Sequence, residues 1–481
     1  MSLRQKTLSG LTWSFVDSMS SQAVALIIGI VLARILSPRE FGLLGMIAIF
    51  ISISECIINS GLCNALIRKI DCTQADYSTA FYFNVASGIL LFGLLYFFSP
   101  HIGLFFAEPS LVSIIRIMGF LIVIDSLTLV QRTILIKNLN FRLQARISMI
   151  SSVLSGIFAI LLAHSNYGVW SLVMWRITRQ SINSLLLWIW NNWKPSLIFD
   201  LPSFKQLFGF GYKLLLSSLI DTIYKNSYYF IIGKYYSASD LGFFTRADEF
   251  AKIPSTNLQV ILRRVSFPIL STIQNDIPRL KKNYRKLIRS SMFITFVLML
   301  GMAAVAKPMI VSLIGEKWLP SVVYLQLLCF NAMLYPLQAL NLNILQVRGR
   351  TDLYLKLVII NKLLLVPSVV IGLIYGIIPM LCVLLGCSLI TYLSYAFCSG
   401  ALIDYHVKEQ ILDIMPSFLL SLVTSIPIYI LSIFLPYSSF PILCILICIG
   451  ALLLFAVSEI IRHPDYLFLK SLLMSYKPLA R

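Results

Sequence analysis

The chain has 481 residues, of which 58% are hydrophobic and 12% are charged, whereas soluble domains carry about 25% charged residues. It has 39 basic and 20 acidic side chains, a net charge of +19. This composition excludes a water-soluble globular protein. Because the basic residues lie mostly between apolar stretches, the positive charge indicates membrane topology rather than nucleic-acid binding.

Apolar stretches recur along the chain, and each is long enough to cross the hydrocarbon layer, about 30 Å thick, as a helix. In chain order the predicted spans are 11–33, 40–62, 77–98, 111–131, 147–163, 167–190, 206–233, 239–262, 290–306, 321–346, 357–375, 378–402, 413–435 and 440–461. We therefore predict an all-α polytopic membrane protein with about 14 transmembrane helices and no separate soluble catalytic domain.

The connectors between these spans differ sharply in charge. With the N-terminus inside, the cytoplasmic connectors and termini carry 26 basic residues and the outer connectors carry six. The positive-inside rule then favours both termini in the cytoplasm. We expect a multi-pass protein of the cytoplasmic (inner) membrane.

The chain also resembles itself at an offset of 200 residues. VLARILSPREFGLL at 31–44 matches IIGKYYSASDLGFF at 231–244, with Gly42 aligned to Gly242 and Glu40 to Asp240. A helix end, an outer turn and the next helix start recur in register, which indicates duplication. We predict two pseudo-symmetric six-helix lobes, at 1–200 and 201–405, followed at 406–481 by two appended transmembrane helices and a cytoplasmic tail.

Two connectors stand out. The join between the lobes, Asn191–Lys205, contains two prolines and several polar residues, which is typical of a hinge-bearing linker. Leu262–Ser291 is the most basic connector and has hydrophobic residues among its charges. We interpret it as an interfacial anchor on anionic lipid, with recognition of a specific partner as the alternative.

Ionisable residues inside spans are costly and usually face a bundle interior or a watery cavity. Three spans of the first lobe carry such residues. The first span has Ser14, Asp17, Ser18 and Ser21, and the sixth has Arg176, Arg179, Gln180 and Asn183. The fourth has Asp125, Thr128 and Arg132 in and beside its inner end and Arg116 nearer its outer end. The guanidinium fork matches phosphate oxygens, so cavity arginines suit a pyrophosphate-bearing substrate. Alternatively, Arg176 or Arg179 pairs structurally with Asp17, Glu55 or Asp125.

The second lobe contains further buried charges, and they are Lys213, Asp221 and Lys225 in the seventh span, Asp248, Glu249 and Lys252 in the eighth, and Lys362 in the eleventh. Asp221 with Lys225, and Asp248 with Lys252, have the i, i+4 spacing of helical ion pairs, so pairing competes with substrate contact. Lys362 needs a cavity or a partner across the bundle. Together with Arg116, Asp17, Asp125, Arg176 and Arg179, these residues are our candidates for the substrate path.

The tenth span is rich in amide and phenol groups, which are Asn331, Tyr335, Gln338, Asn341, Asn343 and Gln346. Such groups suit sugar hydroxyls, but they also form interhelical hydrogen bonds within membranes. Both interpretations remain open.

Several enzyme signatures are absent from the sequence. It contains no GxxxxGK[ST] motif for nucleotide hydrolysis and no HExxH or Cys/His cluster for a metal. No outer connector exceeds about 15 residues, which leaves little room for a catalytic loop. We expect no cofactor and no enzymatic activity, although Asp17 or Asp125 could serve as a base in a membrane-embedded glycan-processing enzyme.

The N-terminal block carries a resemblance to a known family. It includes the Leu-x-x-x-x-Phe-Gly turn (Leu36, Phe41, Gly42), the helix end Asn59-Ser60-Gly61-Leu62, and the basic exit at Arg68 and Lys69. With the fourteen-span layout, these residues resemble polysaccharide transporters (Wzx-type flippases) of the multidrug/oligosaccharidyl-lipid/polysaccharide exporter superfamily, especially colanic acid and teichuronic acid exporter-like members.

This resemblance implies a flippase that moves polyprenyl-pyrophosphate-linked repeat units of capsule, exopolysaccharide or O-antigen by alternating access. It also implies coupling to an ion gradient, a lipid-linked oligosaccharide substrate in contact with membrane lipids, and partners such as a polysaccharide polymerase and chain-length machinery. Phe41 and Gly42 are expected to be structural. The alternative within transport is a cation-coupled multidrug exporter, which would favour a net acidic cavity.

Overall fold

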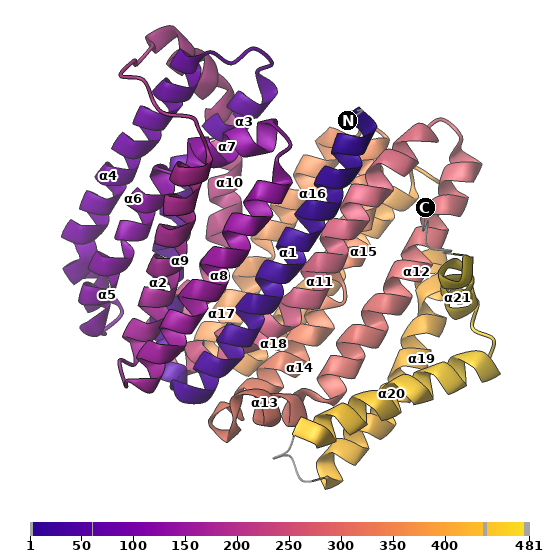
Figure 1. The fold of residues 1–481 in the computed structure, drawn as a ribbon. Coiled ribbons are helices and arrows are strands. Elements are labelled where there is room, and N and C mark those ends of the chain that lie inside the picture. Colours follow the sequence, from indigo (N-terminus) through magenta and orange to yellow (C-terminus); the bar gives the residue numbers. More distant parts are fainter. Residues whose placement is uncertain (1–2, 60, 436–439, 476–481) are drawn as a thin grey trace. The chain divides into compact units, whose positions relative to one another are not determined.

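The computed structural model describes residues 3–59, 61–435 and 440–475, and within these ranges all regular structure is helical. The chain forms two compact units, Met1–Gly242 and Phe243–Arg481. Figure 1 shows the helices in sequence colours. The two units divide at Gly242 rather than near Asp200, and the predicted lobe boundaries at 200 and 405 stay predictions.

The first unit is a bundle of long helices with two broken ones. Its helices are α1 (Leu3–Ile35), α2 (Pro38–Asn59), α3 (Leu62–Arg68), α4 (Gln74–Phe105), α5 (Ser110–Met118), α6 (Phe120–Ser126), α7 (Leu129–Lys137), α8 (Phe141–His164), α9 (Val169–Trp190), α10 (Leu201–Tyr235) and the start of α11 (Ala238–Thr272). Helix α1 packs along α8, and α10 packs along α2. The break between α2 and α3 depends on Gly61, which has a left-handed φ of 70° and lies where a Cβ would be 2.4 Å from the Gly211 carbonyl oxygen.

The second unit continues α11 and is also a helical bundle. Its further helices are α12 (Ile277–Ala304), α13 (Ala306–Ile314), the 3-10 turn Glu316–Trp318, α14 (Ser321–Ala332), α15 (Tyr335–Val347), α16 (Thr351–Leu363), α17 (Leu365–Tyr375), α18 (Ile377–Gly400), α19 (Val407–Phe434), α20 (Phe440–Ile460) and α21 (Pro464–Ser475). Its core includes residues of α12, α14, α15 and α18 with no exposed surface, such as Tyr284, Met292 and Leu340.

Every predicted span overlaps a helix or a broken helix of the structure. Among the described residues, eleven helical segments are long and apolar enough to cross a membrane. The predicted spans in α9, α10 and α11 are not among these eleven, because these helices carry polar and charged residues such as Arg176, Lys225 and Lys252. The chain is a helical multi-pass membrane protein, and the number of fourteen spans is not confirmed.

The internal repeat is visible as a contact between its two copies. An added Cβ on Gly42 would lie 1.6 Å from the carbonyl oxygen of Ala238, and one on Gly242 would lie 1.9 Å from that of Pro38. The two helix starts are capped alike, because the Ser37 hydroxyl donates to Glu40 at 2.9 Å and the Ser237 hydroxyl to Asp240 at 2.6 Å. The predicted structural role of Gly42 is confirmed. The side chain of Ser14 and the structure of Ser60, both cited in the sequence patterns, lie outside the described residues.

The segment between α9 and α10, predicted to be a hinge-bearing linker, is held against α4. The Trp193 indole donates to Gln74 at 2.8 Å, and its ring packs edge-on against Phe81 at 5.9 Å. Further along, the backbone N–H of Ser196 donates to Ser78 at 3.0 Å, and that of Asp200 to Thr79 at 2.9 Å. Side chains of α4 therefore replace the solvent that a hinge loop would have around its backbone.

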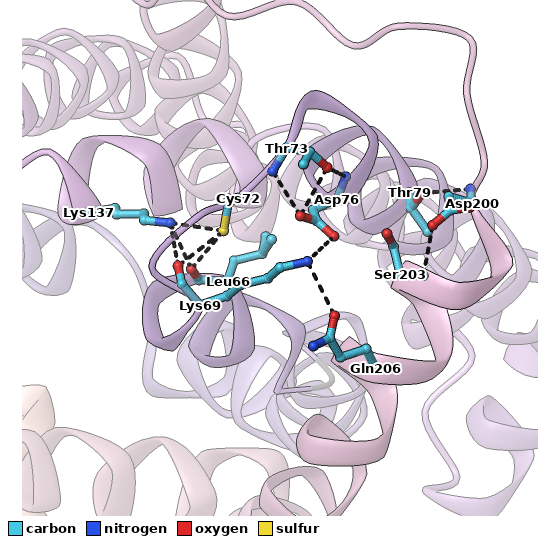
Figure 2. Close-up of polar contacts among 10 residues, drawn as sticks. All are labelled: Leu66, Lys69, Cys72, Thr73, Asp76, Thr79, Lys137, Asp200, Ser203 and Gln206. Atoms are coloured by element: carbon cyan, nitrogen blue, oxygen red, sulfur yellow. Dashed lines mark hydrogen bonds and ion pairs between the residues drawn. The ribbon is translucent and has the colours of Figure 1, made fainter.

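Figure 2 shows how the start of α10 is fixed next to this segment. Asp200 caps α10 by accepting the Ser203 N–H at 2.9 Å, and its hydrogen bonds with Ser203 hold the pKa of Asp200 below its usual value. The Lys69 ammonium bridges Asp76 at 2.8 Å and Gln206 at 3.2 Å. Since Asp76 is fully buried and Gln206 lies on α10, this lysine ties α10 to the start of α4.

The basic stretch 262–291 is mostly helical, and part of its charge is paired within the protein. Leu280, Tyr284 and Ile288 are fully buried on one face of α12. The adjacent positions Lys281, Arg285 and Arg289 form ion pairs with Glu409, Asp413 and Asp465 of α19 and α21, the first at 2.9 Å and the third at 3.0 Å. Carboxylates 128 or more positions away in the chain thus pair with these three residues, and the interpretation of the stretch as a lipid anchor stays a prediction.

The carboxylate of Asp413, paired with Arg285, is buried and also accepts from the Tyr405 hydroxyl at 2.7 Å. Burial, with the hydrogen bond to Asp413, raises the pKa of Tyr405 well above its usual value.

We expect Asp413→Asn to lower the unfolding free energy by about 1–3 kcal/mol, because Arg285 and Tyr405 lose a buried partner. The control is Asp352→Asn, which breaks the exposed pair with Arg350 and should change it by less than about 1 kcal/mol. Thermal unfolding in detergent compares the two, and equal melting temperatures would contradict this expectation.

Candidate functional site

The first unit encloses a charged cavity of about 390 Å³. Its polar lining comes from α1, α2, α6, α7, α8 and α9, and consists of Asp17, Glu55, Asp125, Arg132, Gln144, Ser148, Arg176, Arg179, Gln180 and Asn183. A few apolar residues, among them Ile51 and Leu121, complete the wall. Three cations and three carboxylates thus meet inside one helical bundle.

Helix α9 supplies the largest share of this lining. Arg176, Arg179, Gln180 and Asn183 follow i, i+3, i+4 and i+7, so the helix turns all four toward the same side. The sequence predicted this shared face, and the structure places all four residues at the cavity. Neighbouring positions Leu172 and Val173 are buried in the bundle and fix the helix in place.

Two of the three carboxylates of the cavity, Asp17 and Asp125, accept hydrogen bonds from neutral side chains. Asp17 accepts from Ser21 at 3.3 Å, and the Ser21 hydroxyl lies 2.8 Å from that of Ser148 on α8. The predicted polar side of α1 therefore faces another helix at Asp17 and Ser21. The side-chain amide of Gln180 donates to Asp125.

The two cavity arginines of α9 differ in their exposure and in their contacts with other residues of the protein. Arg179 is half-buried, and among the described residues it forms no ion pair. Arg176 is exposed to the cavity and has contacts within the protein. Two buried oxygens of the lining, Asn183 Oδ1 and Gln144 Oε1, have no hydrogen-bond partner among the described residues. The cavity therefore holds cationic donors and neutral acceptors that a polar ligand can satisfy.

Some cavity residues were not among the candidates from the sequence. Glu55 lines this cavity and also a second one, of about 510 Å³, between α2, α3 and α10. Ser52, Glu55, Cys56 and Asn59 follow i, i+3, i+4 and i+7, and this polar stripe on α2 was the available signal. Arg132 directly follows the predicted end of the fourth span, and it lies at the cavity because α7 extends this span to Lys137.

Two candidate cations lie outside this cavity. Arg116 donates to the Ser99 hydroxyl at 3.1 Å, and its guanidinium stacks over the Tyr96 ring at 4.5 Å. The ammonium of Lys213 lies 5.9 Å from the centre of the Tyr212 ring. Arg116 is therefore engaged by a hydroxyl and an aromatic ring, whereas Lys213 is exposed beside its neighbour Tyr212.

The predicted ion pairs on α10 and α11 are present. Asp221 and Lys225 lie 2.8 Å apart, and Asp248 and Lys252 lie 2.6 Å apart. Glu249 pairs with Arg246. Lys225 additionally lines the second cavity, which contains Glu55.

Lys362 lies on α16 in the second unit, whereas the charged cavity is formed by residues of the first unit. It is half-buried and has contacts within the protein. Its neighbour Asn361 lines a cavity of the second unit. Among the candidates, the structure therefore brings Asp17, Asp125, Arg176 and Arg179 together in one cavity of the first unit.

The amides of the tenth span are used mainly between helices. Asn331 donates to Tyr335 at 2.9 Å, and Asn341 accepts from Ser399 at 2.5 Å. Asn343 donates to Ser266 at 2.9 Å. Interhelical bonding accounts for Asn331 and Asn341 without a substrate.

Sequence comparison adds to this geometry. Residues 31–323 match the family model described as polysaccharide biosynthesis protein. The chain is 29% identical over 447 residues to the lipopolysaccharide biosynthesis protein WzxC of Escherichia coli (strain K12), covering 90% of this chain and 89% of the relative. It is 27% identical over 354 residues to the teichuronic acid biosynthesis protein TuaB of Bacillus subtilis (strain 168), covering 73% of each.

Solved structures with the same fold include two membrane transporters. The lipid II flippase MurJ in an inward closed conformation matches with a TM-score of 0.76 at 18% identity, over 93% of this chain and 98% of that one. An inward-facing MATE family multidrug resistance transporter matches with a TM-score of 0.61 at 14% identity, over 81% and 99%. At these identities the likeness concerns the fold. The match to the family model covers more than half of the sequence, and the chain therefore belongs to the polysaccharide biosynthesis protein family.

Proposed function

We propose that this protein flips polyprenyl-pyrophosphate-linked oligosaccharide repeat units of capsule, exopolysaccharide or O-antigen across the cytoplasmic membrane. Membership of the polysaccharide biosynthesis family and the names of the relatives, WzxC and TuaB, support a role in polysaccharide assembly. The fold shared with a lipid II flippase supports movement of a lipid-linked saccharide.

The observation that carries this proposal is the charged cavity of the first unit. A pyrophosphate cannot cross hydrocarbon unaided, because moving an ion out of water costs many kcal/mol. Arg132, Arg176 and Arg179 supply guanidinium groups that match phosphate oxygens in charge and in planar geometry. Three carboxylates in the same cavity offset these charges when the substrate is elsewhere.

The transport cycle that we propose is alternating access between two lobes, at 1–200 and 201–405, with residues 406–481 appended. Energy would come from an ion gradient, and cavity carboxylates such as Asp17 and Asp125 are candidates for the coupling. A polysaccharide polymerase and its chain-length machinery would consume the flipped unit. A multidrug exporter for cationic drugs is disfavoured by the three arginines.

The test of this function is to delete the gene and analyse the lipid-linked intermediates. We expect the unmodified repeat unit to accumulate on its carrier lipid in the inner leaflet, and the surface polysaccharide to disappear. Accumulation of an intermediate in the outer leaflet would favour a glycan-processing enzyme instead. Unchanged lipids and polysaccharide would reject the proposal.

We further propose that both termini and the start of α12 face the cytoplasm. The 26 to six distribution of basic residues supports this orientation, and the pairing of Lys281 with Glu409 keeps the starts of α12 and α19 on the same side. A cysteine at Asn275 should therefore react with an impermeant thiol reagent only after the membrane is opened. A cysteine at the exposed Ser165, in a predicted outer connector, should react in intact cells. The reverse labelling would overturn the topology.

A further inference from the structure

We propose that a neutral cavity in the second unit binds an uncharged sugar of the lipid-linked repeat unit, which rests on the proposed flippase function. The cavity measures about 150 Å³ and lies between α11, α15, α16 and α18. Its polar wall consists of Gln259, Gln338, Asn343, Tyr354, Asn361 and Tyr395. Among the described residues, none with a charged side chain lines this cavity, in contrast to the cavity of the first unit.

Part of this polar wall is already engaged in holding the bundle. Gln338 donates to the Ser388 carbonyl oxygen at 3.0 Å, and Asn343 donates to the Ser266 hydroxyl at 2.9 Å. Asn361 accepts from the Thr391 hydroxyl at 2.9 Å. These bonds fix the orientation of three amides. They use the amide nitrogens of Gln338 and Asn343 and the amide oxygen of Asn361, and they leave the opposite end of each amide facing other atoms or the cavity.

The remaining groups offer both donors and acceptors. No partner among the described residues is found for the Asn361 amide nitrogen, the Gln259 amide or the Tyr354 hydroxyl. The carbonyl oxygens of Gln338 and Asn343 still have acceptor capacity, since their hydrogen bonds above use the amide nitrogens. By contrast, Asn331 and Asn341 use both ends of their amides within the bundle.

This chemistry fits a sugar better than the other parts of the substrate. Sugar hydroxyls donate and accept, and so do amides and phenols, whereas a phosphate needs cations and a polyprenyl tail needs an apolar wall. The volume is several times the roughly 30 Å³ that a water molecule occupies in the liquid, so the cavity has room for a ligand larger than one water. Because the wall is neutral, binding a charged sugar there would leave its charge without a partner.

The sharpest variants are Asn361→Leu and Tyr354→Phe. The first replaces the amide with an apolar side chain of similar size. Thr391 keeps its second hydrogen bond, to the Cys387 carbonyl oxygen at 2.9 Å, so the packing should survive. The second removes a single hydroxyl and keeps the ring. The matched control is Asn283→Leu, the same substitution at a half-buried amide of α12 outside the cavity.

Binding to the purified full-length chain is measured by native mass spectrometry with two lipids. One is the lipid-linked saccharide extracted from the deletion strain, and the other is the same polyprenyl pyrophosphate without sugar. We expect the wild-type chain to prefer the glycosylated lipid, and Asn361→Leu and Tyr354→Phe to weaken its binding by about tenfold while leaving the sugar-free lipid within about twofold. Asn283→Leu should change neither.

Each other outcome is informative. If the variants bind the glycosylated lipid as the wild type does, or lose both lipids in proportion, the sugar assignment is overturned and the flippase proposal stands. A wild-type chain that binds both lipids equally also overturns the sugar assignment. If the wild type binds neither lipid, the proposed function fails and this inference fails with it.

Discussion

Replacing Arg179 with alanine is expected to reduce export of the lipid-linked repeat unit by about 10- to 100-fold, while the protein is inserted at its normal level. Arg179 lines the charged cavity and forms no ion pair among the described residues, so its removal strands no buried carboxylate partner. A hydrogen bond to a charged group contributes about 1.5–3 kcal/mol, which corresponds to this range. Arg176→Ala should act in the same direction. Export is measured as surface polysaccharide and abundance by immunoblotting of membranes.

The conservative variant and the control separate charge from geometry. Arg179→Lys keeps the charge but loses the planar fork, and should restore export only in part. Arg116→Ala removes an arginine of the same unit that lies against Ser99 and Tyr96, outside this cavity, and should leave export near the wild-type level.

A structural role predicts a different pattern. If Arg179 served to neutralise Asp17, its loss would leave an uncompensated buried charge at a cost of about 3–5 kcal/mol and reduce the amount of protein. Adding Asp17→Asn would then restore that amount. Full export by Arg179→Ala at normal abundance would reject its place in the substrate path.

The sequence predicted the helical bundle because hydropathy and length alone identify apolar spans. The spacing of polar residues also located the cavity face of α9 correctly, since residues at i, i+3, i+4 and i+7 lie on one side of a helix. Single charges were less informative. Arg116 lies against the Tyr96 ring and Lys213 is exposed beside Tyr212, and the spacing of charges along a helix does not say which neighbour each side chain meets.

Long-range pairs could not be predicted from one sequence. The Arg285–Asp413 and Arg289–Asp465 contacts join helices that are far apart in the chain, so the basic connector was taken for a lipid-binding segment. The cavity position of Glu55 could not be predicted for the same reason. The polar stripe on α2 indicates a polar face, but it does not show that arginines of other helices line the same cavity. The neutral cavity of the second unit arises where four helices meet, and only Gln338 and Asn343 of its wall stood out in the sequence.

Replacing Gly42 with alanine is expected to destabilise the protein by about 3 kcal/mol or more. The new methyl group would lie 1.6 Å from the Ala238 carbonyl oxygen, so two helix starts must move apart. Overpacking of a well-packed core costs about 1–3 kcal/mol and occasionally more, and here the obstacle is backbone rather than a flexible side chain. Gly242→Ala should have a similar effect, because its methyl would lie 1.9 Å from the Pro38 carbonyl oxygen.

The matched control is Gly209→Ala in α10, where an added Cβ has no atom within 4 Å. Alanine is favoured over glycine in a helix by about 1 kcal/mol, so this variant should be neutral or more stable. Thermal unfolding in detergent ranks the three proteins. A Gly42→Ala protein that melts with the Gly209→Ala protein would contradict the contact.

The double variant tests whether the two repeat copies share one contact. Gly42 meets the start of the helix that carries Gly242, and Gly242 meets the start of the helix that carries Gly42. Once the first methyl group has separated the two helices, the second meets less resistance, so the combined loss should be smaller than the sum of the single losses. If the two losses were strictly additive, the clash of each added methyl group would be relieved by its own local shift. In that case the aligned glycines would still reflect the repeat in the sequence, but they would not act as a single packing unit.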